Sequence, residues 1–196
     1  ACWPTGRFRT EGRREVVSAS SARLIAEVAF PGAAIGLGAG VVAGGVAAVA
    51  GLSPGYVALT TLGLGLPLAL FGAGYDLLLA SGRLRLGGVT PAVLYWLPAF
   101  PVSRLIHEML LDVGLGREVG LPEALLPFLA YQAILSAGFA IGFLWLHEHL
   151  GPLWWPRIRD HNPVAARYVS LYTRQAAALE SRKRAGGESS RKKRGR

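Results

Sequence analysis

Five residues with metal-binding or phosphate-binding side chains follow the last long apolar stretch of the sequence: His147, Glu148, His149, Asp160 and His161. Imidazole and carboxylate groups are ligands for zinc and other divalent metals. In a helix, the two histidines of a His-Glu-His triplet point about 200° apart, whereas helical zinc motifs space their histidines four residues apart. A metal site therefore requires that the helix end before the triplet. If the helix continues, we expect these residues to cap the apolar segment at the membrane interface, within reach of lipid phosphate.

A second group of ionisable residues lies inside an apolar segment. Arg104, Glu108 and Asp112 are spaced four residues apart, and His107 lies beside them. This spacing predicts one helical face that carries an Arg–Glu pair with Asp and His adjacent. One charge in the middle of a membrane helix costs roughly 2.5–3.5 kcal/mol. We therefore expect partners or a water-filled recess around this face, which serves either as a structural network that fixes helix register or as a functional site.

Two carboxylates, Glu27 and Asp76, lie near the ends of two further apolar segments, at depths that a four-helix topology makes similar. Neighbouring carboxylates can share a proton or bind a cation, which would make this pair a proton or ion site. Alternatively, each side chain reaches the membrane interface or pairs with Arg23, Arg83 or Arg85.

Glycine recurs at four-residue intervals in the first apolar segment, at Gly32, Gly36, Gly40 and Gly44. Residues four apart lie on one helical face, so the spacing predicts a ridge without side chains that a neighbouring backbone can approach closely. One interpretation is packing within the chain, against the apolar segment that follows. The other is a docking face for another membrane protein.

The composition indicates a membrane protein. Of the 196 residues, 52% are hydrophobic and 17% are charged, whereas soluble domains average roughly 25% charged residues. The net charge is +3 over residues 1–23, −3 over 24–150 and +9 over 151–196, so the positive charge lies outside the apolar body. This distribution argues against a soluble fold, a disordered chain and nucleic-acid binding. Cys2 is the single cysteine, which excludes an intrachain disulfide and a cysteine-rich metal site, and we predict no cofactor.

Four apolar segments are long enough to cross a membrane: residues 24–50, 57–80, 91–111 and 124–146. The expected fold is an all-α integral membrane bundle of four transmembrane helices, forming a domain over residues 24–150. Short segments rich in Lys and Arg remain cytoplasmic, and four crossings with both termini inside satisfy that rule for every basic segment. A re-entrant third segment is the alternative, since that segment carries the ionisable group.

The termini are basic. Residues 1–23 are expected to form a basic cytoplasmic segment. After an interfacial turn, Asn162 and Pro163 are typical of a helix start, and an amphipathic cytoplasmic helix is expected to complete residues 151–184. Residues 185–196 are expected to form a disordered polybasic tail that attracts anionic phospholipids by roughly 1 kcal/mol per nearby charge.

Three classes of function remain open. We favour a non-catalytic accessory or scaffold subunit of a larger membrane complex, which uses the glycine ridge and the polar face of the third helix. A small ion-linked, proton-linked or lipid transporter that uses the intramembrane carboxylates is the first alternative. An enzyme acting on lipid head groups at the inner face is the second. The 18 arginines against 3 lysines are typical of a GC-rich bacterial source, so a multi-pass protein of the bacterial plasma membrane is expected.

Overall fold

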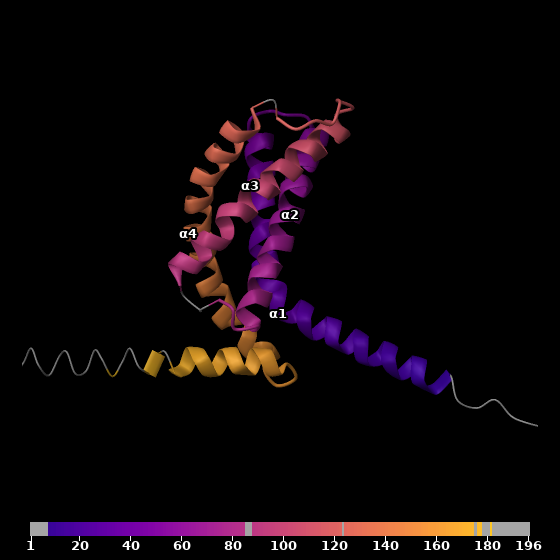
Figure 1. Ribbon diagram of the computed structural model, residues 1–196, viewed down its shortest axis with the longest axis vertical. Coiled ribbons are helices and arrows are strands. Elements are labelled where there is room, and N and C mark those ends of the chain that lie inside the picture. The colour runs from indigo at the N-terminus through magenta and orange to yellow at the C-terminus, as the bar shows by residue number, and fades with distance from the viewer. Residues whose placement is uncertain (1–7, 85–87, 123, 175, 178–180, 182–196) are drawn as a thin grey trace, which may run out of the picture. The chain divides into compact units, whose positions relative to one another are not determined.

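The computed structural model describes residues 8–84, 88–122, 124–174, 176–177 and 181, and side chains from Ala22 onward. Two compact units divide the chain, residues 1–150 and 151–196. Among the described residues, helices joined by turns and loops are the regular structure, and there is no strand. The long helices are α1 (Phe8–Val49), α2 (Pro54–Ala80), α3 (Val89–Gly114) and α4 (Leu125–Ile158) (Figure 1).

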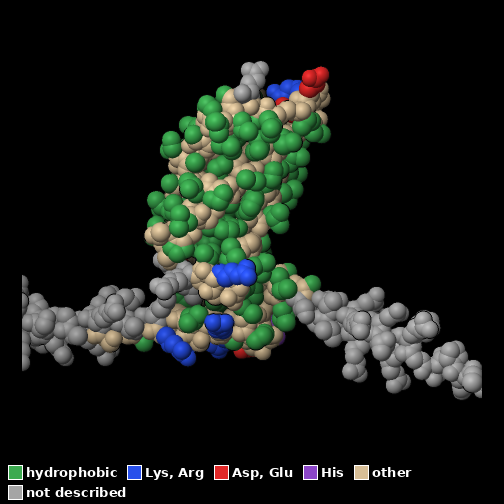
Figure 2. All heavy atoms as spheres, viewed as in Figure 1, with side chains coloured by type: hydrophobic (Ala, Val, Ile, Leu, Met, Phe, Trp, Pro, Cys, Tyr) green, Lys and Arg blue, Asp and Glu red, His purple; other side chains and the backbone are tan. Residues whose placement is uncertain are grey.

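All four long helices contain a segment with the length and apolar character needed to cross a membrane. The predicted all-α bundle of four such helices is therefore confirmed. The third is an uninterrupted helix of 26 residues, although it contains Pro98 and Pro101. Hydrophobic side chains cover the visible face of the bundle (Figure 2), as expected of a surface in contact with lipid.

Two helix boundaries differ from the sequence-based expectation. Helix α1 begins at Phe8, so part of the predicted basic segment is already helical. Helix α4 continues to Ile158, through Pro152 and Pro156, where an interfacial turn was expected from residue 151. Membrane helices tolerate proline because neighbouring groups satisfy the carbonyls that it frees.

Helices α1 and α2 meet along the glycine ridge. A Cβ atom on Gly32 would overlap the carbonyl of Gly72, and one on Gly36 would overlap the backbone of Leu68 and Ala69. Further along, Gly40 lies against Gly65 and Gly44 lies against Thr61. The structure thus uses the ridge for packing within the chain. The alternative interpretation, a docking face for another protein, is corrected because α2 occupies that face.

Helix α4 is held by aromatic rings instead of small residues. On α3, Trp96 lies 4.7 Å from the ring centroid of Phe143, and Phe100 lies 5.0 Å from that of Phe139. On α2, Tyr75 lies 5.2 Å from Phe143. Ring pairs at these distances contribute about 0.5–1.5 kcal/mol beyond their buried area. Their bulk keeps α4 farther from its neighbours than α1 is from α2, because side chains at the contact set the distance between helices.

The second unit contains a short helix over residues 163–174. Asn162 caps it, since its Oδ1 accepts hydrogen bonds from the backbone amides of Val164 and Ala165, at 3.1 and 3.3 Å. The predicted start at Asn162 and Pro163 is therefore confirmed. Tyr168 is buried and stacks on Trp155 at 4.4 Å, so this side chain of the predicted amphipathic helix packs within the second unit. The predicted tail, residues 185–196, lies outside the described residues.

The glycine ridge can be tested with a single methyl group. We expect Gly36→Ala to lower the stability of the protein by about 1–3 kcal/mol, because the added Cβ meets helix backbone that cannot move aside cheaply. Gly38→Ala is the matched control: a Cβ there meets nothing within 4 Å, and alanine favours the helix by up to about 1 kcal/mol. Thermal unfolding in detergent would measure both, and equal effects would contradict the packing described here.

Candidate functional site

Asp76 on α2 and His147 on α4 form a buried polar pair. The Oδ1 atom of Asp76 lies 2.5 Å from Nε2 of His147, and both side chains are fully buried. Charged and polar groups are costly to bury unless they are hydrogen-bonded to a partner. Each of these two side chains therefore depends on the other for its place inside the bundle.

The second oxygen of Asp76 bonds to the first helix. Gly32 donates its backbone N–H to Oδ2 of Asp76 at 2.7 Å. Pro31 precedes Gly32 and lacks an N–H, so it disturbs the helical hydrogen-bond ladder at this point. The absence of side chains at Gly32 and Gly72 lets the two helices approach closely enough for this bond. One carboxylate thus connects α1, α2 and α4.

Aromatic rings surround the imidazole of His147. Tyr75 contacts it edge-on at 5.5 Å, and Phe143 stacks on it at 5.7 Å. A carboxylate and an imidazole at hydrogen-bond distance can hold one proton between them. The chemistry that this geometry offers is therefore proton binding, combined with a cross-link between helices.

The sequence did not predict this pair. One interpretation of the sequence paired Asp76 with Glu27, but Glu27 accepts a hydrogen bond from Nε of Arg23 at 2.9 Å, as the other interpretation expected. Asp76 and His147 are 71 residues apart. The sequence offered one signal for this pair, which is the depth of each residue in the membrane. In a four-helix topology, Asp76 lies near the end of α2 and His147 lies in the part of α4 that approaches the same side of the membrane.

The predicted metal or head-group residues are not brought together as a set. Helix α4 continues through the triplet, so His147 points inward while Nδ1 of His149 lies 2.6 Å from the carbonyl oxygen of Trp145. Asp160 and His161 both belong to the second unit. The carboxylate of Asp160 lies 3.5 Å from Nε of Arg159. Glu148 lies on the same helix between the two histidines. Among the described residues, no group of three or more potential ligands could hold a metal ion.

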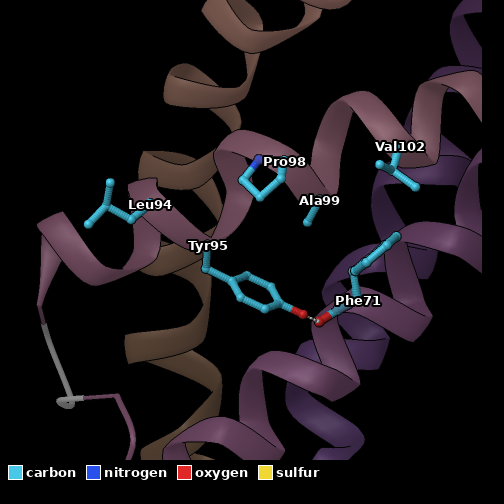
Figure 3. A pocket seen from close by; sticks show the side chains of 6 residues that line it. All are labelled: Phe71, Leu94, Tyr95, Pro98, Ala99 and Val102. Carbon is cyan, nitrogen blue, oxygen red and sulfur yellow. Dashed lines mark hydrogen bonds between the residues drawn. The ribbon is translucent and has the colours of Figure 1, made fainter.

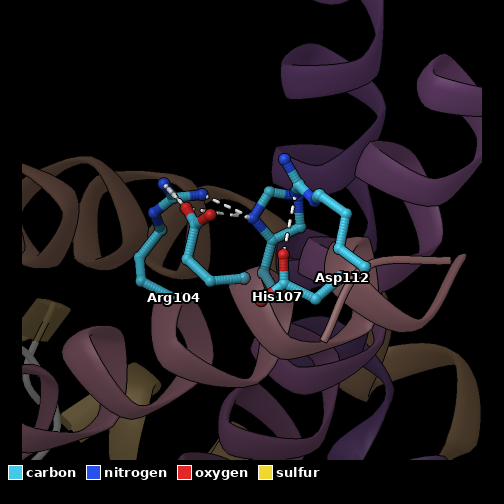
Figure 4. A network of polar contacts seen from close by, with 5 residues as sticks. Arg104, His107 and Asp112 are labelled. Atoms are coloured by element: carbon cyan, nitrogen blue, oxygen red, sulfur yellow. Dashed lines mark hydrogen bonds and ion pairs between the residues drawn. The ribbon is translucent and has the colours of Figure 1, made fainter. Parts of the chain in front are cut away.

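The predicted polar face of α3 is partly assembled. Arg104 donates from Nη2 to Oε1 of Glu108 at 2.7 Å, and its Nη1 lies 2.7 Å from Nδ1 of His107 (Figure 4). Asp112 pairs instead with Arg117, at 2.9 Å. Because α3 ends at Gly114, the chain turns back there and brings Arg117 within reach. The face is therefore an Arg104–His107–Glu108 group, with Asp112 in a separate ion pair.

The contact between Arg104 and His107 defines the proton position on the imidazole. An arginine side chain only donates hydrogen bonds, so Nδ1 of His107 is the acceptor. The neutral ring then carries its proton on Nε2. This nitrogen is buried and has no hydrogen-bond partner among the described residues.

A pocket beside α3 is apolar and holds no reactive group. Its volume is about 310 Å³, and its lining comes from Phe71 on α2 and from Leu94, Tyr95, Pro98, Ala99 and Val102 on α3 (Figure 3). The hydroxyl of Tyr95 donates to the carbonyl oxygen of Phe71 at 2.6 Å, so the polar atom of this side chain is already engaged. The pocket therefore offers mainly apolar contacts.

The Asp76–His147 pair can be tested by apolar replacement. Asp76→Leu leaves the imidazole and the Gly32 amide without the carboxylate, and we expect a loss of about 3–5 kcal/mol in stability. The double variant Asp76→Leu/His147→Leu should recover part of that loss, because the imidazole is then removed together with the carboxylate. Only the Gly32 amide still lacks its acceptor. Asp160→Asn, at an exposed position, is the control. Equal Tm values for single and double variants would contradict a coupled pair.

Comparisons with family models, with curated proteins and with solved structures return no match to this chain. Its function must therefore be inferred from the geometry of its own residues.

Proposed function

We propose that this multi-pass membrane protein is a non-catalytic subunit of a larger membrane complex, and that a partner helix covers the Arg104–Glu108 edge of α3. The observation that carries the proposal is the ion pair itself. Arg104 lies ten residues from Gly114 and fifteen from Val89, which is about 15 and 22 Å along the helix axis. The side chain of Arg104 is 24% exposed, and that of Glu108, one turn later, is 35% exposed.

A partly exposed ion pair at this depth is unfavourable in lipid, because hydrocarbon offers no hydrogen bonds. The guanidinium of Arg104 has five N–H donors, and two of its nitrogens point to His107 and Glu108. A partner helix with hydroxyl, amide or carboxylate groups would provide further acceptors and exclude lipid.

The charges favour a different chain over a second copy. Two copies in the same orientation, related by a two-fold axis through this edge, would place Arg104 against Arg104 and Glu108 against Glu108. Like charges in contact are repulsive, and the repulsion is stronger away from water. The glycine ridge is occupied by α2, so we assign the contact with the partner to α3 alone.

A proton-linked role is the second candidate, and the buried Asp76–His147 pair favours it. Intramembrane ionisable pairs often mark proton relays. An enzyme acting on head groups has less support, since His147 is bonded inside the bundle. We further propose that the exposed Arg167 and Arg174 of the second unit attract anionic phospholipids, and that the protein is of bacterial origin with both termini cytoplasmic.

Site-specific photo-crosslinking in native membranes tests the subunit proposal. Leu97 lies two turns before Arg104 on the same edge of α3 and is 42% exposed. A photoreactive residue at Leu97 should yield one protein adduct of discrete mass, and Arg104→Gln/Glu108→Gln should abolish it. Ile134 on α4, 74% exposed, is the control and should yield lipid adducts only. Lipid adducts alone at Leu97, or a protein adduct unchanged in the double variant, would overturn the proposal.

A further inference from the structure

A second pocket lies between α2 and α3, away from the one beside Tyr95. Its volume is about 340 Å³, within the roughly 300–1,000 Å³ that small-molecule sites occupy. The described residues that line it are alanine, valine, leucine and glycine, and on α2 they run from Ala58 to Leu66. Leu59 contacts Gly114 near the start of α2 and at the end of α3. The pocket therefore offers apolar walls along the contact between two helices.

The imidazole of His107 borders this pocket. A Cβ atom on Gly63 would lie 3.3 Å from Cδ2 of His107 and 3.6 Å from Cβ of Leu110. Gly63 and Leu110 both line the pocket. Because Nε2 is bonded to Cδ2, the Nε2 atom of His107 lies next to the pocket wall. Glycine at position 63 leaves that part of the wall without a side chain from α2.

The Nε2 atom of His107 is a hydrogen-bond donor without an acceptor. Its ring partner Nδ1 accepts from Arg104, which places the proton of the neutral imidazole on Nε2. The side chain is 4% exposed, and among the described residues Nε2 has no hydrogen-bond partner. A buried donor without an acceptor is destabilising. A molecule in the adjacent pocket that carries an acceptor would remove this cost.

We propose that the pocket binds a neutral, membrane-soluble quinone, and that Nε2 of His107 donates a hydrogen bond to one of its carbonyl oxygens. The apolar walls suit a ring and an alkyl chain, and the carbonyl provides the missing acceptor. Binding requires Nε2 to become accessible, which a change of rotamer at the exposed Leu110 beside it provides. The site does not depend on the partner helix proposed at the Arg104–Glu108 edge.

The chemistry of the pocket argues against other occupants. A bound water needs two to four polar partners, but the described lining residues offer no polar side chain beside His107. An ionised fatty acid would bring an unpaired charge into an apolar site. His107 lies seven residues before Gly114, about 10 Å along the axis of α3. Phospholipid ester carbonyls belong to the interfacial region outside the hydrocarbon core, whereas a quinone dissolves within the core.

Infrared spectroscopy tests the site, because a hydrogen bond weakens a C=O bond and lowers its stretching frequency. The probe is decylubiquinone labelled with ¹³C at its carbonyls, added to the full chain in detergent. We expect a saturable carbonyl band at lower frequency than that of the free probe. His107→Leu removes the donor and should abolish this band, with binding about fivefold weaker, the factor that corresponds to one net hydrogen bond.

Two phenylalanine variants separate loss of the site from loss of the fold. Ala58→Phe fills the pocket from an exposed position, so it should abolish the shifted band and leave the Tm without probe unchanged. Leu94→Phe is the matched control, because it adds the same ring to the pocket beside Tyr95, whose hydroxyl is already bonded, and it should retain the band. No saturable band in the unmodified protein, or a band that persists in His107→Leu or Ala58→Phe, would overturn the proposal.

A second probe distinguishes a quinone from a phospholipid. Phosphatidylglycerol labelled with ¹³C at its ester carbonyls should show no saturable shifted band. A shifted band for the phospholipid and none for the quinone would assign the pocket to a lipid ester and overturn the proposal.

Discussion

The carboxylate of Asp76 is the group on which the arrangement of the bundle depends. It accepts a hydrogen bond from the amide of Gly32 on α1 and bonds to His147 on α4. Both contacts lie away from water, where an unpaired charge is most costly. The close approach of α1 to α2, the inward direction of His147 and the aromatic enclosure of its ring are all conditions for satisfying this one side chain.

The bundle combines two kinds of helix contact. Between α1 and α2, the small residues at Gly32, Gly36 and Gly40 bring backbone against backbone. Helix α4 instead meets α2 and α3 through aromatic rings. The first kind of contact excludes side chains, whereas the second creates an interior wide enough for polar groups such as His147. The imidazole of His147 accordingly reaches Asp76 where α4 meets α2.

Patterns within a segment were sufficient to predict the helices and the glycine ridge, because hydropathy and four-residue spacing are local properties. The Arg104–Glu108 pair was equally local. The Asp76–His147 pair was not, since it joins residues 71 positions apart and depends on the order and tilt of the helices. The end of α4 was also misjudged, because Pro152 and Pro156 resemble stop signals in the sequence.

The 71 residues between Asp76 and His147 also have a consequence for biosynthesis. At about 5–20 residues per second, His147 leaves the ribosome roughly 4–14 s after Asp76. Throughout that interval the first two helices can already be in place as a hairpin, joined by the short turn around Gly51. The order of translation therefore makes α4 the last of the four long helices to arrive, and its arrival completes the burial of a carboxylate synthesised seconds earlier.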